Sequence, residues 1–390
     1  MHAPGLPILY VSQPVYLPAL VLQDDVKYRS RVLRGSGVGR SVDDQRHNES
    51  AVGIARPVRG PTVGVNGHSR AQVWTHFICP DRCDHLVVHL DASTLSHPFA
   101  VWDISEWVVV SQEARGIDPK DWVALQEDAP KDGQSSWWLF KPIKAASYRR
   151  CDDWSEKMAS ELGRLIGLPA ARVELAARGG EVGIISRNVT PDGCSLESGD
   201  TLLSEFDGYL SSAGDDRPKN RVGHNLDNIQ RLLEDVRAPG ELASETSGFD
   251  LFAGYLVFDA WIANTDRHAI NWGVLTQNVD GSRFLAPSFD HGTALASGVQ
   301  EKSMATSDAP AYAERGMAHR FENGRHLPLV ELALQAVARA GKDAQQWIER
   351  IGDLDAEVVE AVVHAVPGMS ELRRSFVRTL LDTNRRRLTA

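Results

Sequence analysis

Short apolar runs follow one another between residues 74 and 190, whereas longer amphipathic stretches dominate the chain beyond residue 195. The short runs are rich in β-branched and aromatic residues and are separated by turn-forming residues, a pattern typical of strands. We expect them to form a small antiparallel sheet. The expected strands are residues 85–90, 107–110, 121–125, 137–140, 173–175 and 182–186.

Helical periodicity appears once inside this region and then throughout the second half. A helix is predicted over residues 154–167, where Asp153 or Ser155 can cap the start and Gly167 ends the pattern. Its apolar face consists of Met158, Leu162, Leu165 and Ile166. Further helices are predicted at residues 225–236, 248–263, 329–340, 344–351, 356–365 and 370–388. This order predicts an α+β, bilobal, protein-kinase-like fold with a small β-rich N-lobe and a larger, mostly helical C-lobe.

The first 73 residues show little apolar periodicity and predict a disordered N-terminal extension. The string G-S-G-V-G-R-S at residues 35–41 suggests a phosphate loop, but it lacks the G-K-[ST] ending and a preceding strand, which favours a linker. Cys79 and Cys83 have the spacing of half a zinc site. No second Cys or His pair completes it, so reduced thiols are the better interpretation.

Charge and hydropathy exclude some functions. Lys and Arg total 42 and Asp and Glu total 52, a net charge of -10, which disfavours direct nucleic-acid binding. The apolar stretch at residues 7–22 is interrupted by prolines and has no basic leader, so we expect neither a signal peptide nor a membrane span. The sequence predicts a cytoplasmic protein without a membrane partner.

Candidate chemistry is concentrated in N-T-D-R-H-A-I-N, residues 264–271, and in the F-D-H-G string that contains Asp290. Asp266 and Asn271 have the spacing of the base and metal-binding amide in a kinase loop D-x-x-x-x-N. Asp290 follows a predicted hairpin, with strands at 272–275 and 284–286, where a second metal-binding carboxylate is expected. Alternatively, these residues cap a turn and a helix. Their combination favours phosphoryl transfer, with Asp266 as base and Asn271 and Asp290 as magnesium ligands.

Two neighbours in the same string have roles of their own. Arg267 is expected to tie a loop carboxylate or backbone group in place. His268 either orients the loop from a buried position or lies beside the transferred phosphoryl group, and it is kept as a second catalytic candidate.

A lysine at the end of an apolar strand is a second signal. Lys141 ends W-W-L-F-K, and Glu156 follows 15 residues later in the first turn of the predicted helix. Such a Lys–Glu pair positions nucleotide phosphates in kinases. The alternatives are a strand-end lysine equivalent to Lys144, and Glu161 as the partner. Gly116 and Lys120, in G-I-D-P-K, are candidates for a loop that covers the phosphates.

Together these strings resemble the HipA-like family of bacterial serine/threonine kinases, from about residue 104 to the C-terminus. The likeness rests on L-F-K-P, S-E-K-M-A-S-E-L-G-R-L-I-G-L-P, I-I-S-R-N-V, N-T-D-R-H-A-I-N and L-A-P-S-F-D-H-G. The resemblance implies that Lys141 binds ATP and that Ser186 and Arg187 belong to the hinge that holds adenine. The D-R-H-x-x-N string is also similar to the catalytic loop of phosphatidylinositol kinases.

The chain departs from the family at two points. The family's regulatory serine corresponds to Glu113, and the N-terminal subdomain of full-length HipA toxins is not recognisable in residues 1–100. An antitoxin-like partner is therefore an implication of the resemblance alone.

The sequence thus predicts an ATP- and Mg²⁺-dependent kinase that acts on a hydroxyl of a protein substrate. Residues 74–190 would form the ATP-binding N-lobe, and residues 191–390 the C-lobe with the catalytic loop and metal site. A small-molecule or lipid head-group kinase and a nucleotide-binding pseudokinase remain as alternatives.

Overall fold

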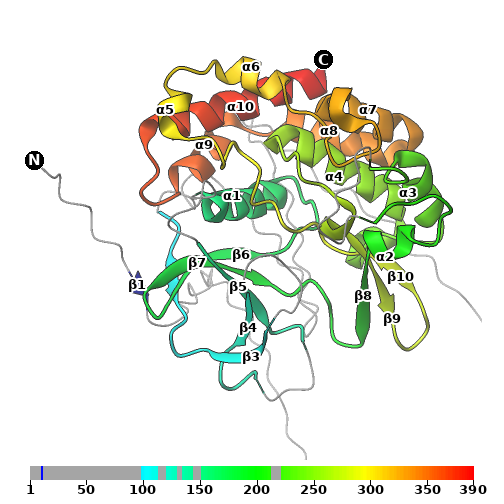
Figure 1. The fold of residues 1–390 in the computed structure, drawn as a ribbon, viewed down its shortest axis with the longest axis horizontal. Coiled ribbons are helices and arrows are strands. Elements are labelled where there is room, and N and C mark those ends of the chain that lie inside the picture. Colours follow the sequence, from blue (N-terminus) through cyan, green and yellow to red (C-terminus); the bar gives the residue numbers. More distant parts are fainter. Residues whose placement is uncertain (1–9, 12–97, 113–119, 130–133, 144–150, 212–220) are drawn as a thin grey trace, which may run out of the picture. The chain divides into compact units, whose positions relative to one another are not determined.

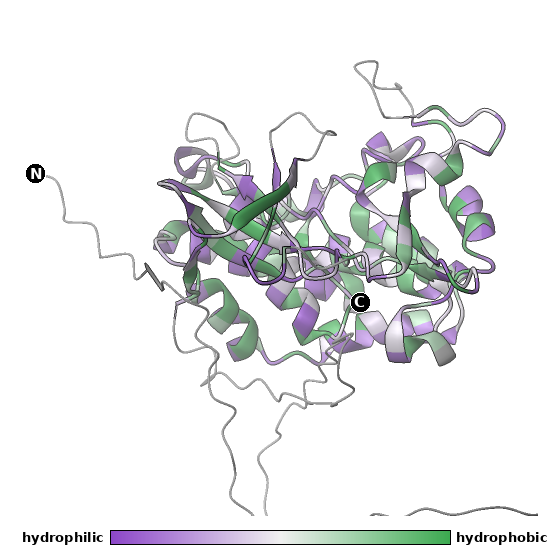
Figure 2. Ribbon diagram, turned by 90° about the horizontal axis from the view of Figure 1, so that it is seen from below, coloured by the Kyte–Doolittle hydropathy of each residue, from purple (hydrophilic) through white to green (hydrophobic). Residues whose placement is uncertain are grey.

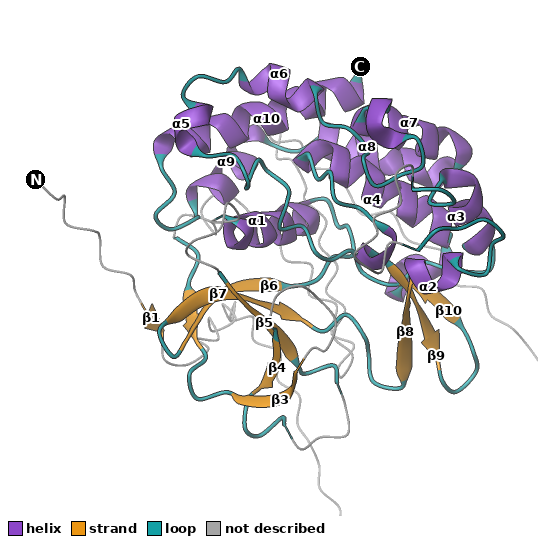
Figure 3. Ribbon diagram, in the orientation of Figure 1, coloured by secondary structure: helices purple, strands orange, loops and turns teal. Residues whose placement is uncertain are grey.

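The computed structural model describes residues 10–11, 98–112, 120–129, 134–143, 151–211 and 221–390. The strand expected at residues 85–90, the pair Cys79 and Cys83, and most of the expected N-terminal extension lie outside the described residues. In the part of the chain that is described, strands and helices gather in separate regions (Figure 3).

One sheet contains seven strands among the described residues, in the order β1-β2-β6-β7-β5-β4-β3. The pairs from β6 through β7, β5 and β4 to β3 are antiparallel, whereas β2 runs parallel to both β1 and β6. The expectation of a purely antiparallel sheet is therefore wrong at this edge. The strands are β1 (Tyr10–Val11), β2 (Val101–Asp103), β3 (Val108–Gln112), β4 (Asp121–Ala124), β5 (Trp138–Pro142), β6 (Val173–Arg178) and β7 (Glu181–Arg187).

Helix α1 (Asp152–Leu165) connects β5 to β6 and lies between the sheet and the helical region (Figure 1). The helix begins two residues earlier than its apolar pattern predicts. Cys151 occupies the N-cap position without a side-chain hydrogen bond, so Asp153 lies in the first turn instead of capping it. Gly167, with a φ of 66°, follows the helix as predicted, because a left-handed residue ends a helix most readily as glycine.

Helix α4 (Gly248–Ile262) forms the centre of the second lobe. Every residue of this helix is buried, which matches a sequence that is apolar on all sides. Ser247 and Asp250 form a capping box at its start, and Ala263, with a φ of 53°, ends it. In Figure 2 the strands of the sheet carry long hydrophobic stretches, whereas the outer helices alternate hydrophobic and hydrophilic residues.

Further helices surround α4. The helix expected at residues 225–236 ends early, at Leu232, and Arg237 beyond it forms isolated β-bridges with Ser247 and Phe284. The α-helices are α2 (Gly199–Leu203), α3 (Leu226–Leu232), α5 (Glu301–Met304), α6 (Ala309–Glu314), α7 (Leu329–Arg339), α8 (Gln345–Gly352), α9 (Ala356–His364) and α10 (Glu371–Thr389). The 3₁₀ helices are η1 (Gly240–Ser244), η2 (Ala269–Asn271), η3 (Gly324–His326) and η4 (Lys342–Ala344).

The catalytic-loop string leads into the middle strand of a second sheet. The predicted hairpin is present as β9 (Gly273–Gln277) and β10 (Arg283–Leu285), and β8 (Cys194–Ser198) adds an unpredicted third strand in the order β10-β9-β8. The N-T-D-R-H-A-I-N string therefore runs from the end of α4 to the start of β9. None of the described helices is long and apolar enough to cross a membrane.

Candidate active site

Lys141 at the end of β5 joins two carboxylates that are distant in the sequence. Its Nζ lies 2.9 Å from Oε1 of Glu156 in α1 and 3.1 Å from Oδ1 of Asp290 in the loop after β10. The second oxygen of Glu156 accepts a hydrogen bond from the backbone N–H of His291 at 3.2 Å. Lys141 is thus neither a solvent-facing strand-end lysine nor a partner of Glu161, and the predicted Lys141–Glu156 pair is present.

Glu161, the rival partner, belongs to a different ion-pair network on α1. The ammonium of Lys157 contacts Glu161 and Glu174, each at 2.7 Å, and Arg164 also pairs with Glu161. This network joins α1 to β6. It leaves Glu156 as the acidic residue of α1 that faces Lys141.

The charges of the Lys141 cluster support one another. Burial disfavours the charged ammonium, but the carboxylates of Asp290 and Glu156 outweigh this effect and raise the pKa of Lys141. The Lys141 ammonium in turn holds the pKa of the Asp290 carboxyl well below its ordinary range, against the effect of burial and with a further contribution from Lys120. Burial raises the pKa of Glu156. Lys141 and Asp290 are therefore both ionised at neutral pH.

Asp290 combines partial exposure with an unusual backbone. Its side chain is 39% exposed, compared with 5% for Glu156, so one side of the carboxylate faces solvent. Its φ is 63°, in the left-handed region that few residues other than glycine occupy, although aspartate does so more often than most. Backbone strain of this kind is concentrated at functional sites, where the surrounding structure enforces it.

The catalytic-loop string is held by a buried arginine. The Nε and one terminal nitrogen of Arg267 contact the two carboxylate oxygens of Asp259 at 2.7 and 2.8 Å. The other terminal nitrogen donates to the backbone carbonyl of Asn271 at 2.7 Å, and Ser288 accepts a further bond at 2.8 Å. Arg267 therefore fixes the loop by joining it to α4, as the sequence predicts for a loop-tying arginine. Asp259 was not anticipated.

Asp266 and Asn271 are oriented by hydrogen bonds within the loop. The side-chain nitrogen of Asn271 donates to the carbonyl of Asp266 at 2.9 Å, and the amide of Asp266 donates to the Asn264 side chain at 3.2 Å. Because the Asn271 nitrogen is engaged by the loop, its side-chain oxygen remains the group available to a ligand. The Asp266 side chain is 22% exposed.

The carboxylate of Asp266 has two cationic or potentially cationic neighbours. Arg320 donates from Nε to Oδ1 at 2.5 Å, and Nε2 of His268 lies 3.8 Å from Oδ2. Burial, with Arg320 contributing and Asp266 opposing, lowers the pKa of His268, so its imidazole is neutral at neutral pH. Nothing in the sequence pattern marked Arg320, which lies 54 residues after Asp266 in the connection between α6 and η3.

Few protein donor groups are available at the predicted metal site. Among the described residues there is no group of three or more His, Cys, Asp or Glu side chains suited to a metal ion. The carboxylate of Asp290 and the side-chain oxygen of Asn271 are nevertheless hard oxygen donors of the type that Mg²⁺ prefers. Mg²⁺ usually takes only one or two protein ligands and completes its shell with water and phosphate oxygens. These residues fit magnesium.

The structure describes only part of the predicted phosphate loop. Gly116, Glu113 and Lys144 lie outside the described residues, whereas Lys120 is described and acts electrostatically on Asp290. Lys120 is therefore the part of the predicted phosphate loop that the structure places near the site.

The predicted hinge residues lie at the end of β7. Ser186 lies opposite Leu139 and therefore shares the sheet face of Lys141. Arg187 lies opposite Trp138 on the other face, with its guanidinium 5.9 Å from the Trp138 ring. The amide of Arg187 donates to the carbonyl of Arg172, immediately before β6, at 2.8 Å.

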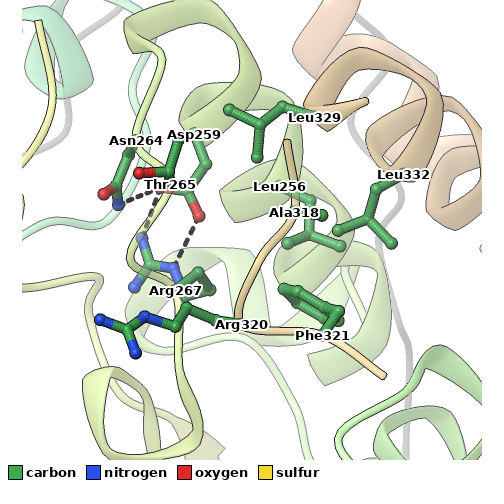
Figure 4. Close-up of a pocket in the computed structure, with 10 residues that line it drawn as sticks. All are labelled: Leu256, Asp259, Asn264, Thr265, Arg267, Ala318, Arg320, Phe321, Leu329 and Leu332. Carbon is green, nitrogen blue, oxygen red and sulfur yellow. Dashed lines mark hydrogen bonds and ion pairs between the residues drawn. The ribbon is translucent and has the colours of Figure 1, made fainter. Parts of the chain in front are cut away.

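A pocket lies behind the catalytic loop (Figure 4). Its polar wall contains the hydrogen-bonded side chains of Asp259, Asn264 and Arg267, and the opposite wall is apolar. Residues that line the pocket hold the loop in place, and none of them belongs to the Lys141 cluster. Its lining consists of Leu256, Asp259, Asn264, Thr265, Arg267, Ala318, Arg320, Phe321, Leu329 and Leu332.

Comparisons with known proteins give the family and the fold. The family model described as the HipA-like C-terminal domain matches residues 113–362, more than half of the chain. A search of curated proteins finds no match.

Among solved structures, the Helicobacter pylori proinflammatory kinase CtkA is 16% identical, with a TM-score of 0.51 over 74% of this chain and 95% of that one. HipA in the Shewanella oneidensis MR-1 complex of HipA, HipB and operator DNA is 13% identical, with a TM-score of 0.39 over 77% of this chain and 70% of that one. The likeness to CtkA shows a kinase-like fold.

Proposed function

The chain belongs to the family of HipA-like C-terminal domains, and we propose that it is an ATP- and Mg²⁺-dependent kinase that phosphorylates a protein hydroxyl. The observation that carries this proposal is the position of Lys141 between Glu156 and Asp290, at 2.9 and 3.1 Å. A half-buried lysine held between two carboxylates is suited to positioning phosphates beside a metal-binding aspartate.

Each residue of the site has a role in this proposal. Lys141, held by Glu156, contacts the phosphates of ATP. Asn271 and Asp290 would hold Mg²⁺, which neutralises charge on the phosphate oxygens when bound.

Asp266 orients the acceptor hydroxyl and takes its proton. The hydroxyl oxygen forms a bond to the γ-phosphorus while the bond from that phosphorus to the bridging oxygen breaks, and ADP leaves. Neutral His268, 3.8 Å from Asp266, acts as a second polar group beside the acceptor.

Nucleotide binding with and without metal tests this proposal. We expect the wild-type chain to bind ATP well with Mg²⁺ and poorly in EDTA, because Asp290 and the phosphates repel each other without the cation. Asp290→Ala should remove most of this metal dependence. Asp280→Ala is the matched control, since Asp280 accepts a hydrogen bond from the Ser282 backbone in the exposed β9–β10 turn. Calorimetric titrations showing equal ATP affinity in EDTA and in Mg²⁺ would contradict the metal role.

The acceptor class needs a separate measurement. Transfer of radiolabel from γ-labelled ATP should appear in the protein fraction of a cell lysate and not in its small-molecule or lipid fraction. Labelling of metabolites or lipids alone would assign a different acceptor, and no turnover with intact ATP binding would indicate a pseudokinase.

A further inference from the structure

Two segments beside the catalytic loop are joined by hydrogen bonds, and we call residues 221–225 and 318–327 together the arginine clasp. Glu322 donates from its amide to the His224 carbonyl at 2.8 Å. Its carboxylate accepts hydrogen bonds from the Gly223 amide at 3.2 Å and from the Asn225 side chain at 2.5 Å. The clasp holds Arg221 and Arg320 in fixed backbone positions although about 100 residues separate them.

His224 connects the clasp to the start of β9. The indole N–H of Trp272 donates to Nε2 of His224 at 3.2 Å, so Nε2 accepts and Nδ1 carries the proton. Nδ1 then donates to the Arg320 carbonyl at 2.7 Å. Burial lowers the pKa of His224 to about 4, which keeps the ring neutral at physiological pH. Phe321 stacks on the ring at 4.4 Å, so the Arg320 backbone is fixed relative to the catalytic loop.

The backbone of the clasp is strained at Arg221. Arg221 has a φ of 51° and Asn323 a φ of 55°, both in the left-handed region. Asparagine adopts this region readily, whereas for arginine the conformation costs free energy that the surrounding structure must offset. The fold therefore imposes the backbone conformation at Arg221.

The clasp places the Arg320 guanidinium beside Asp266, where the acceptor hydroxyl is proposed to bind. Nε of Arg320 donates to Oδ1 of Asp266 at 2.5 Å, and the Arg320 side chain is 25% exposed. Besides burial, the charge of Arg320 and, more weakly, that of Arg221 lower the pKa of His268. This local positive charge contrasts with the net charge of -10 of the whole chain.

We propose that Arg320 recognises an acidic residue of the acceptor protein close to the hydroxyl that Asp266 activates. This inference rests on the proposed kinase function. Arg320 exchanges the carboxylate of Asp266 for that of the acceptor, and the exchange frees Asp266 to accept the hydroxyl proton. Arginine suits this role because its planar guanidinium binds carboxylates through paired hydrogen bonds. An acidic acceptor approaching a chain of net negative charge needs such a local attraction.

Three serine-centred peptides that differ only in their flanking residues test the inference. One peptide carries Glu on both sides of the serine, one carries Gln and one carries Lys. With ATP and Mg²⁺, we expect kcat/KM for the Glu peptide to exceed that for the Gln peptide about tenfold or more, the scale of one charged hydrogen bond. The Lys peptide should be the poorest substrate. Arg320→Gln should remove the preference, and Arg320→Lys should restore part of it.

The ratio between peptides separates recognition from a merely structural role of Arg320. A variant that only misplaces Asp266 lowers the rate for all three peptides and leaves their ratio unchanged, which would overturn the inference. Arg283→Gln is the control, because Arg283 pairs with the exposed Asp235 at the surface. It should retain the wild-type ratio.

A binding measurement keeps the inference testable if none of the peptides is phosphorylated. Fluorescence anisotropy of the same labelled peptides, with Mg²⁺ and a non-hydrolysable ATP analogue, should show tighter binding of the Glu peptide to the wild type than to Arg320→Gln. Equal binding to both proteins overturns the inference. Transfer to all peptides at equal rates also overturns the inference but leaves the kinase proposal intact. Absence of Mg²⁺-dependent ATP binding contradicts the kinase proposal itself.

Discussion

Replacing Arg267 by methionine tests the buried support of the catalytic loop. The Arg267 and Asp259 side chains are 2% and 1% exposed, and their contacts are 2.7 and 2.8 Å long. Removing the guanidinium leaves the Asp259 carboxylate buried with one remaining side-chain partner, Asn264 at 2.8 Å. Breaking a buried pair on one side costs about 3–5 kcal/mol. We therefore expect Arg267→Met to lower the free energy of unfolding by about this amount.

Urea unfolding followed by circular dichroism measures this loss. Arg283→Met is the control, because its partner Asp235 is 68% exposed and surface pairs contribute about 0–1 kcal/mol. The double variant Arg267→Met/Asp259→Leu should recover part of the loss, since it removes the uncompensated charge. A loss below about 1 kcal/mol for Arg267→Met, equal to that of the control, would refute the reasoning.

Two further predictions concern the site and the helix that supports it. Lys141→Met should abolish phosphoryl transfer while Lys144→Met retains most of it, and comparable transfer by the two variants in a radiolabel assay would contradict the assignment. Burial raises the pKa of Asp153 to about 6 from its ordinary 3.8, so the folded state loses stability as the pH rises from 3.8 to about 6, and the loss is complete above about 6. Asp153→Asn should therefore increase the free energy of unfolding near pH 8 but not near pH 4. Equal effects at both values, measured by urea unfolding, would show that Asp153 ionises freely.

Strong local patterns made much of the fold predictable. Helix α4 and the hairpin β9–β10 follow from an apolar run and from strands flanking a turn, and both are present with ends within about two residues. Strand β8 was missed because three of its five residues are exposed, and C-S-L-E-S shows little burial pattern. The parallel pairing of β2 was missed because it depends on a crossover through three strands and α1, which no local pattern specifies.

The residues of the site also include some that local sequence patterns predicted and others that they did not. Lys141 and Glu156 lie within one strand–helix unit, so their spacing predicted the pair that the structure contains. Asp259 was overlooked because its helix is otherwise apolar and gave no sign of a partner for Arg267. Arg320 contacts Asp266 directly, but hydrogen bonds of the arginine clasp between distant segments hold its backbone, and one sequence does not reveal which distant segments meet.

Phosphoryl transfer and ATP affinity, measured together for Asp266→Asn, test the kinase account most directly. Asparagine keeps the shape of the side chain but removes the charge that takes the acceptor proton. We predict that transfer falls by about 10²–10⁴-fold while ATP affinity with Mg²⁺ stays near that of the wild type. His268→Ala, measured in parallel, should lose less. Near-normal transfer by Asp266→Asn together with loss of transfer by His268→Ala would contradict the account and assign the base to the histidine.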